Sequence, residues 1–425
     1  MYQELLDLER NGSPIRVAVV GAGGAMGRGV CLQMALTPGL RLIAAADIRL
    51  SEASRAAKLY RDALSRRGRL AGGRAFAGDP LVTDDLRPLI SDGRSSFDVL
   101  IECTDTVAFG ASLVESTLLS GIDVVLMNAE IDYLLGSHLR RIARKSDSVV
   151  SSDAGDQHGV LARMIDEACM WGFQIVLAGN IKGFLDRSAT PESIVAEAQA
   201  RNLTPHMCTA FTDGTKLNIE MALVANSANL RPLVRGMTGP RARHVNEAMQ
   251  SFDFDSILEL GGGVDYILGA EPGGGVFLVV RSDEPVQRTY LDYYKLGTGP
   301  YYLLYRPYHL CHLETPFAIG RAVLQRRSVL QPSSLRSAEV IAIAKRDIGA
   351  GTAIERGIGS DSIYGLIDQR DLALKAGGVP ICLFDQLTGD VVRVLRRVEK
   401  GCVITWDDID MPDTQLTRAY RMQEA

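Results

Sequence analysis

The sequence lacks any pair of cysteines that could form a familiar motif. Its seven cysteines are scattered over 425 residues, and no two of them have the spacing of a CxxC pair. An odd and unclustered set argues against a disulfide framework and against a cysteine-rich zinc site. We therefore expect a chain that stays reduced in the cytoplasm.

Long apolar runs and a strong charge of one sign are also missing. No run approaches the ~20 apolar residues of a membrane-spanning helix, and the opening MYQELLDLERNG lacks the features of a signal peptide. The formal net charge of -5 gives no general attraction to nucleic acid. We expect a small-molecule substrate, and neither a nucleic acid nor a membrane as partner.

The length of 425 residues exceeds one ordinary domain of ~100 to 200 residues. Apolar runs first alternate with helical stretches, which predicts βαβ units, and the later rhythm is mixed. The last part has short apolar runs between glycines, which predicts strands. The predicted fold class is α/β, with a Rossmann-type parallel-sheet domain over 1–155, a central α+β substrate and dimerisation domain over 156–335, and a small β-rich domain over 336–425. A helix over 314–327 is expected to pack back on the first domain.

The loop GAGGAMG follows an apolar strand and opens a helix. Its glycines Gly21, Gly24 and Gly27 let backbone N–H groups approach a pyrophosphate, and the helix N-terminus adds positive potential. Ala25 and Met26 belong to the same predicted cofactor-binding turn. A glycine-rich turn is also typical of any tight strand-to-helix connection, so the surrounding residues decide between the two readings.

An acidic residue follows at the distance that dinucleotide-binding folds use. Asp47 ends the next apolar run, about 20 residues after the last glycine, where a carboxylate can accept hydrogen bonds from ribose hydroxyls. Its charge repels a 2′-phosphate and favours NAD, whereas Arg49 could pair with that phosphate. The predicted cofactor is NAD or NADP, with NAD favoured, and the need for a divalent metal stays open.

Polar residues end two later apolar runs of the first domain. Thr104 in IECTDT, and Asn128 and Glu130 in LMNAE, fall where strands of a parallel sheet present their carboxyl ends to nicotinamide and substrate. We expect Thr104 and Asn128 to bind the cofactor and Glu130 to be catalytic. Asn128 is equally typical of a turn, and Glu130 of the first turn of a helix.

A hydride-transfer enzyme needs a proton donor beside the reacting oxygen and cations for an anionic substrate. Lys182 in AGNIKGFLDR follows an apolar strand and is the expected acid, with Asp186 a substrate-binding candidate. FTDGTKLNIEMALVANSAN predicts an amphipathic helix with Lys216, Glu220 and Asn226 near one face. Lys216 is expected to bind an anion or share the proton chemistry, and Asn226 to bind substrate. The alternative for the lysines is a solvated charge, or an ordinary i,i+4 pair with Glu220.

Further substrate-binding candidates lie in two loops. Arg241 lies in MTGPRARH, and Arg306 and His309 end the run GTGPYYLLYRPYHL, where a proline prevents a regular strand from continuing. The alternatives are an exposed basic loop and a structural histidine. Asp153 and Asp156 could hold Mg²⁺ or Mn²⁺, but acids are common in such loops, so no metal ligands are predicted.

These stretches resemble a known group of enzymes. GAGGAMG, LMNAEID, AGDQ, FTDGTKLNIEMALVANSANL, GPRA, GVDYILG, GTGPYYLLYRPYHL and AEVIAIAKRDIGAGTAI are similar to SAF-domain-containing, homoserine-dehydrogenase-like oxidoreductases. That group includes the type II 1-deoxy-D-xylulose 5-phosphate reductoisomerases. The resemblance spans nearly the whole chain and implies a homodimer with a nicotinamide domain, a substrate and dimerisation domain, and a SAF tail that helps to close a carbohydrate site.

The chain departs from both characterised activities of the group. GNIKGFLDR is less basic than the matching reductoisomerase loop, and TDGTK places its Asp and Lys one residue closer than homoserine dehydrogenases do. We therefore expect an NAD(P)-dependent oxidoreductase for a small polyhydroxy or phosphorylated carbonyl compound, with or without isomerisation. The alternatives are a simple sugar, hydroxy-acid or amino-acid dehydrogenase, and a non-catalytic nicotinamide-binding SAF protein.

Overall fold

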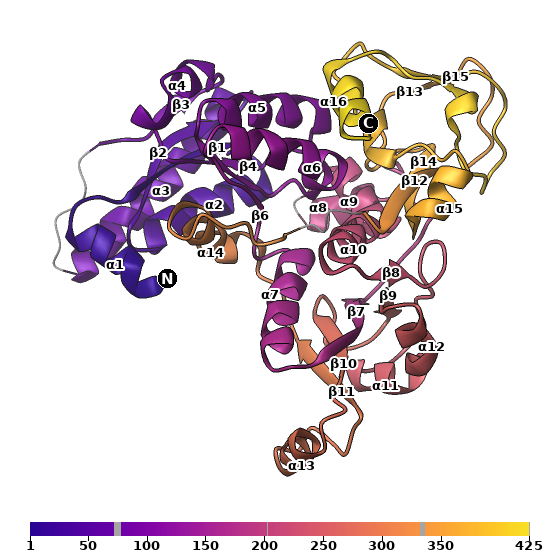
Figure 1. Ribbon diagram of the computed structural model, residues 1–425. Helices are drawn as coiled ribbons and strands as arrows, with labels where there is room; N and C mark the ends of the chain where they lie inside the picture. Colours follow the sequence, from indigo (N-terminus) through magenta and orange to yellow (C-terminus); the bar gives the residue numbers. More distant parts are fainter. Residues whose placement is uncertain (72–77, 202, 332–335, 425) are drawn as a thin grey trace. The chain divides into compact units, whose positions relative to one another are not determined.

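The computed structural model describes residues 1–71, 78–201, 203–331 and 336–424, and Figure 1 traces them. The chain forms two compact units. The first consists of Met1–Asp156, Leu310–Val329 and Thr414–Ala425, and the second of Gln157–His309 and Leu330–Asp413. The domain boundary predicted at residue 335 lies outside the described residues.

The first unit is built on a parallel six-stranded sheet in the order β3-β2-β1-β4-β5-β6. The strands are β1 (Ile15–Val20), β2 (Leu40–Ala46), β3 (Leu81–Thr83), β4 (Val99–Glu102), β5 (Asp123–Leu126) and β6 (Val150–Ser152). The central strands are apolar and buried along nearly their whole length, as expected for a parallel sheet covered on both faces. This is the strand order of dinucleotide-binding sheets, and it confirms the predicted Rossmann-type sheet.

The helices of this unit include two that come from distant parts of the chain. They are α1 (Tyr2–Arg10), α2 (Ala25–Leu36), α3 (Leu50–Ala71), α4 (Arg87–Ser91), α5 (Val107–Leu119), α6 (Ala129–Lys145), α14 (Cys311–Val323) and α16 (Gln415–Glu424). Helix α14 packs on α2 and β5, and α16 packs on α5 and α6 (Figure 1). Gln423 Oε1 accepts a hydrogen bond from the His138 N–H at 3.0 Å, which ties the last helix to α6.

The second unit contains a mixed five-stranded sheet in the order β11-β10-β7-β9-β8. Its strands are β7 (Gln174–Lys182), β8 (Arg231–Pro232), β9 (Gly263–Leu268), β10 (Val276–Arg281) and β11 (Tyr301–Arg306). Strand β7 pairs in parallel with β9 and antiparallel with β10. Its helices are α7 (Gln157–Met170), α8 (Val195–Ala200), α9 (Pro205–Thr212), α10 (Thr215–Ala228), α11 (Ala248–Ser251), α12 (Phe254–Glu259) and α13 (Pro285–Tyr293). This mixed sheet confirms the predicted α+β region.

Short antiparallel strands form the rest of the second unit. They are β12 (Ala338–Ala344), β13 (Ala353–Ile354), β14 (Ile363–Gln369), β15 (Val392–Val394) and β16 (Ile409–Asp410), with helix α15 (Arg370–Lys375). Strand β12 pairs with β14, and β15 lies between β13 and β16. The β-rich tail expected from the glycine-punctuated sequence is therefore present, and its strands pack with the central sheet's helix α10.

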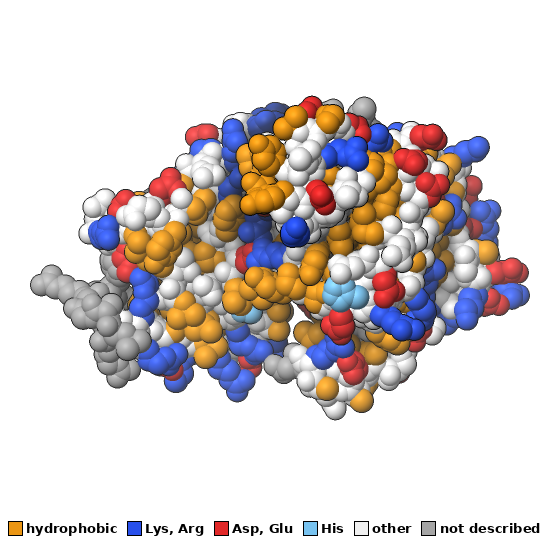
Figure 2. Space-filling view, turned by 90° about the horizontal axis from the view of Figure 1, so that it is seen from below, with side chains coloured by type: hydrophobic (Ala, Val, Ile, Leu, Met, Phe, Trp, Pro, Cys, Tyr) orange, Lys and Arg blue, Asp and Glu red, His pale blue; other side chains and the backbone are white. Residues whose placement is uncertain are grey.

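Among residues 1–71, 78–201, 203–331 and 336–424, no helix has both the length and the apolar character to cross a bilayer. On the face drawn in Figure 2, acidic and basic side chains are interspersed, in keeping with a formal net charge of only -5. That face therefore shows no broad area of a single charge.

Candidate functional site

The glycine loop between β1 and α2 is too tight for side chains. Gly21 has a φ of +73°, and a Cβ there would lie 2.6 Å from the carbonyl oxygen of Cys103. A Cβ on Gly27 would overlap the carbonyl oxygen of Gly21. Helix α2 starts after Gly24, and no side chain of the described residues caps its first turn. The first N–H groups of α2, which include those of Ala25 and Met26, are thus suited to an anion.

Asp47 lies beside this loop, as its spacing predicted. Its Oδ2 accepts a hydrogen bond from the Gly23 N–H at 2.9 Å, and its Oδ1 accepts one from the Arg49 N–H at 3.0 Å. The Arg49 guanidinium is 69% exposed, with Nε 3.9 Å from Asp47 Oδ1. The sequence did not predict the role of Gly23, where a Cβ would press on both Asp47 and Glu52. The loop and the acid therefore form one preorganised group.

The residues that end β4 and β5 also lie together. The carbonyl of Thr104 accepts a hydrogen bond from Asn128 Nδ2 at 3.1 Å. Asn128 precedes α6 and is buried, and its Oδ1 has no hydrogen-bond partner within the part of the chain that the structure describes. Glu130 is buried in the first turn of α6, where the helix dipole favours a carboxylate. Their predicted roles in binding and catalysis stay predictions.

Glu102, the last residue of β4, was not singled out from the sequence. It is fully buried, and its Oε1 accepts hydrogen bonds from the Thr104 N–H at 2.9 Å and from the Thr104 hydroxyl. Its Oε2 finds no hydrogen-bond partner among the described residues. Burial raises the pKa of Glu102 to about 8, against the lowering effect of the Thr104 bonds, and nearby Glu130 and Asp105 add to the rise. The carboxyl group is therefore protonated at neutral pH.

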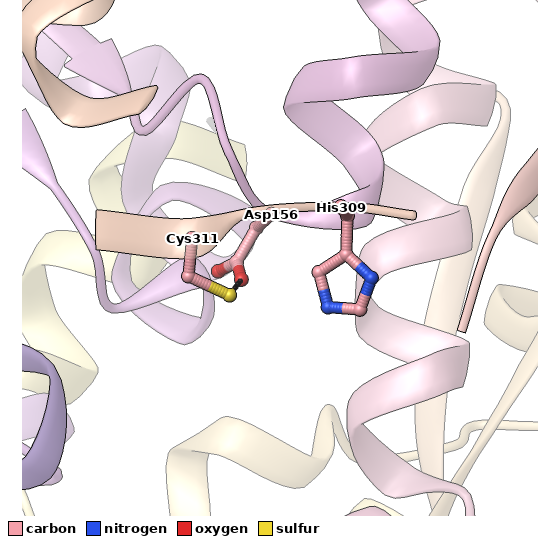
Figure 3. Close-up of side chains that lie close together, drawn as sticks. All are labelled: Asp156, His309 and Cys311. Atoms are coloured by element: carbon pink, nitrogen blue, oxygen red, sulfur yellow. Dashed lines mark hydrogen bonds between the residues drawn. The ribbon is translucent and has the colours of Figure 1, made fainter. Parts of the chain in front are cut away.

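The loop after β6 uses its acids to hold α14. Asp153 Oδ1 accepts a hydrogen bond from the Thr315 hydroxyl at 2.7 Å, and burial together with the charge of Asp156 raises the pKa of Asp153 to about 7. Figure 3 shows Cys311 beside Asp156, and the Cys311 thiol donates to Asp156 Oδ1 at 3.0 Å. His309, also labelled there, belongs to the second unit.

In the second unit, two lysines converge on Phe211. Lys182 ends β7, and its Nζ donates a hydrogen bond to the Phe211 carbonyl at 2.9 Å. Lys216 on α10 has its Nζ 5.7 Å from the centre of the Phe211 ring. Burial lowers the pKa of Lys182, while the charges of Glu220 and Asp213 raise it, and the lowering prevails. The structure thus brings together Lys182, Lys216 and Glu220, which the sequence predicted from two separate stretches.

Helix α10 is not amphipathic, so that prediction was wrong. All residues from Thr215 to Asn226 are buried, including Lys216 and Glu220. The reason is that other elements of the second unit surround the helix, since α7, α9, strands of the mixed sheet and the C-terminal strands all pack on it. Thr215 Oγ1 accepts a hydrogen bond from the Gly365 N–H at 3.0 Å, and Asn218 Oδ1 accepts one from the Ile367 N–H at 2.9 Å. The alternative of a solvated charge for Lys216 and Glu220 is therefore wrong, because both side chains are buried.

Asn226 and Asp186 make local contacts. Asn226 Oδ1 accepts hydrogen bonds from the N–H groups of Ser337 and Ala338 at 2.8 and 2.9 Å, and its Nδ2 donates to the Ala338 carbonyl at 3.3 Å. Asp186 Oδ1 accepts bonds from the Ser188 hydroxyl and N–H, which lower the pKa of this carboxyl. Asn226 thus anchors the start of β12, and the substrate role of both residues stays a prediction.

The register of the mixed sheet aligns three predicted residues at the end of β7. Leu268 pairs with Lys182 on one side and with Arg241 on the other. Across β10, Arg306 lies in line with Asn180, two residues before Lys182. Adjacent strands are ~4.8 Å apart. The backbones of Arg241 and Arg306 therefore lie no more than two strand spacings from the end of β7. His309 follows Arg306, and its Nδ1 lies 2.5 Å from the Gly274 carbonyl oxygen, so it has a local partner.

A buried ion pair adjoins this group and was missed. Lys345, directly after β12, places its Nζ 2.8 Å from Asp213 Oδ2, and both side chains are almost fully buried. Burial raises the pKa of Asp213, and the Lys345 ammonium opposes that rise. The only local signal was a lysine at the end of an apolar strand, which by itself is more typical of a surface residue.

Residues 155–315 match the family described as Oxidoreductase DRL, catalytic domain. The chain carries an oxidoreductase domain. The matched segment contains Lys182, Lys216 and Glu220, so the family match and the buried charged group fall on the same part of the chain. A comparison with curated proteins finds no match.

Several solved structures are similar to this chain at low identity. A homoserine dehydrogenase from Thiobacillus denitrificans is 13% identical, with 91% of this chain and 98% of that chain covered and a TM-score of 0.45. A hyperthermophilic archaeal homoserine dehydrogenase in complex with NADPH is 11% identical over 73% and 98% of the two chains, with a TM-score of 0.42. A DOX-P reductoisomerase in complex with magnesium is 12% identical over 76% and 71%, with a TM-score of 0.39. At these scores the likeness supports no conclusion about substrate or reaction.

Proposed function

We propose that the protein is an NAD(P)-dependent oxidoreductase that acts on a small polyhydroxy or phosphorylated carbonyl compound. The observation that carries the proposal is the group formed by half-buried Lys182 with buried Lys216 and Glu220, inside the segment that matches an oxidoreductase catalytic domain. The same chain holds a glycine loop with an adjacent acid on a dinucleotide-type sheet. A homodimer and a cytoplasmic location belong to the same proposal.

The glycine loop fits the pyrophosphate of a dinucleotide. A Cβ at Gly21 or Gly27 would fill the space where the backbone turns, and the first turn of α2 offers N–H groups to an anion. Asp47 would hold the ribose and favour NAD, with exposed Arg49 as the residue able to accept a 2′-phosphate. The buried Oδ1 of Asn128 suits an amide donor such as the nicotinamide carboxamide. When bound, the nicotinamide supplies or accepts the hydride.

Lys182 is the proposed proton donor to the substrate oxygen. Burial lowers its pKa towards neutrality, which makes an ammonium a better acid, and the Phe211 carbonyl orients its Nζ. Lys216 adds a second cation that would bind a phosphate or carboxylate. Glu220 is buried one turn further along α10 than Lys216, and its charge raises the pKa of Lys182 and so favours the ammonium form.

Substrate turnover tests this proposal directly. We would follow NADH and NADPH oxidation with 1-deoxy-D-xylulose 5-phosphate, with and without Mg²⁺ or Mn²⁺, and then with other sugar phosphates and hydroxy acids. Lys182→Met should lower turnover more than about 100-fold and leave NADH binding unchanged. Exposed Lys375→Met, in the same unit, is the matched control and should keep full activity.

The outcomes separate the candidates. Metal-dependent turnover of 1-deoxy-D-xylulose 5-phosphate would support a reductoisomerase. Metal-independent oxidation of a sugar, hydroxy acid or amino acid would support a simple dehydrogenase instead. If neither NADH nor NADPH binds to the wild-type protein in a calorimetric titration, the proposed function is wrong.

A further inference from the structure

Lys345 lies outside the matched oxidoreductase segment, yet its ammonium is buried against that segment's Asp213. Besides the 2.8 Å contact to Asp213 Oδ2, its Nζ donates to the carbonyls of Ala189 at 2.7 Å and Ser360 at 2.6 Å. Two of the three donors of the ammonium thus bond backbone carbonyls, and its charge pairs with Asp213. The Lys345 side chain is 2% exposed and that of Asp213 0%, so neither charge is screened by water.

Asp213 links this ion pair to the proposed proton donor. Its Oδ1 accepts a hydrogen bond from the Thr215 N–H at 2.8 Å, which fixes the first turn of α10. The same helix carries Lys216 and Glu220. The charge of Asp213 also acts on Lys182 and favours its protonated form. A change in the charge of Asp213 therefore also changes the pKa of Lys182.

The C-terminal strands hold α10 along its length. Gly365 and Ile367 of β14 donate backbone hydrogen bonds to Thr215 and Asn218, and the start of β12 bonds to Asn226. Helix α10 and the C-terminal strands both belong to the second unit, so these contacts lie within one unit. The strands thus support the helix from its first turn to its last.

We propose that the C-terminal strands belong to the catalytic unit, with Lys345 as a positioning residue that sets the charge state of Lys182 through Asp213. The inference rests on the proposed role of Lys182 as proton donor. The charged groups that face Lys182 are Glu220 and Lys216 from α10, Asp213 before it, Arg201 after α8, and Lys345 behind Asp213.

The ion pair predicts the same direction of change for two variants. Asp213→Asn removes the anion, so the pKa of Lys182 falls. Lys345→Met removes the cation that keeps buried Asp213 ionised, so Asp213 takes up a proton and the pKa of Lys182 falls as well. In the double variant no carboxylate is left for Lys345 to act through, so its Lys182 pKa equals that of Asp213→Asn. We expect a fall of at least about 0.5 pH unit in Asp213→Asn.

Competitive acetylation with acetic anhydride, read by mass spectrometry of the Lys182 peptide across a pH series, measures this pKa in the full chain. The readout needs no substrate, so it can fail independently of the proposed function. Exposed Arg346→Ala, the next residue in the chain, is the control and should leave the midpoint unchanged.

A lower midpoint in both Asp213→Asn and Lys345→Met, with no further change in the double variant, supports the inference. It is overturned if the Asp213→Asn midpoint stays at the wild-type value, or if Lys345→Met leaves the midpoint unchanged or raises it, as a cation acting directly on Lys182 would. Should Lys345→Met not fold, the step from Asp213→Asn to the double variant removes the same cation, and a rise of the midpoint in that step overturns the inference.

Discussion

Glu102→Gln should stabilise the first unit, and increasingly so as the pH rises. The wild-type carboxyl has a pKa of about 8 when folded, against an ordinary value of 4.5. Because the folded pKa is raised, the folded state holds a proton that the unfolded state has lost between those pH values. Stability therefore falls as pH rises through this window. Glutamine keeps an acceptor for the Thr104 N–H and cannot ionise.

The size of this effect follows from the difference between the folded pKa of Glu102 and its ordinary value. Each pH unit above the ordinary value costs the wild-type folded state ~1.4 kcal/mol until the folded pKa is reached. At pH 7 the cost is about 3 kcal/mol, while at pH 5 it is below about 1 kcal/mol. We therefore expect the advantage of Glu102→Gln to grow by about 2 to 3 kcal/mol between pH 5 and pH 7.

The assay has to report on the first unit alone. The two tryptophans of the chain, Trp171 and Trp406, both belong to the second unit, so their fluorescence does not follow the first. Hydrogen exchange of the β4 peptide, measured by mass spectrometry at pH 5, 6 and 7, gives the opening free energy of both proteins under matched conditions. Asp153, whose pKa is also raised, is present in both proteins and cancels in the comparison. A difference that does not change with pH would refute the reasoning.

Three further predictions concern the first unit. Gly21→Ala should abolish NADH binding in calorimetry. The control Gly12→Ala should bind NADH normally, because Gly12 has a similar φ of +69° but no described atom lies within 4 Å of an added Cβ. Equal binding by both variants would contradict the tight-turn argument. Asp47→Ser should shift the ratio of NADPH to NADH affinity at least about 10-fold towards NADPH, and an unchanged ratio would remove Asp47 from the ribose site. Arg326→Met should destabilise the unit by about 1 to 2 kcal/mol in the same exchange assay, because Arg326 bonds both oxygens of buried Asp123 while Arg94 still pairs with its Oδ1. An unchanged opening free energy would show that Arg94 alone compensates the charge of Asp123.

Local spacing was enough to locate the glycine loop and its acid. Gly21, Gly27 and Asp47 obey short-range rules, because a strand, a tight turn and a helix fix their relative positions within one βαβ unit. For the same reason Lys182 could be assigned to a strand end before its neighbours were known. Even so, the sequence did not reveal the hydrogen bond from Gly23 to Asp47, since a glycine in a loop carries no sign of its partner.

The protonation of Glu102 depended on packing. Its sequence context is an ordinary acid after an apolar strand, and its raised pKa comes from complete burial behind α5. The burial of α10 on all sides could likewise not be predicted from the periodicity of its sequence. Charged residues on a helix predict a solvent-exposed face, and only the elements packed around α10 overrule that expectation.

By itself, the sequence determined the parallel dinucleotide-type sheet, its glycine loop and its acid, together with the strand-end lysine of the second unit. Only the tertiary structure decided that α16 returns to the first unit and that Lys345 meets Asp213. The physical reason is the distance along the chain over which each interaction acts. Backbone periodicity and turn chemistry act over a few residues, whereas burial and ion pairing depend on segments that are distant in the chain and meet only when it folds.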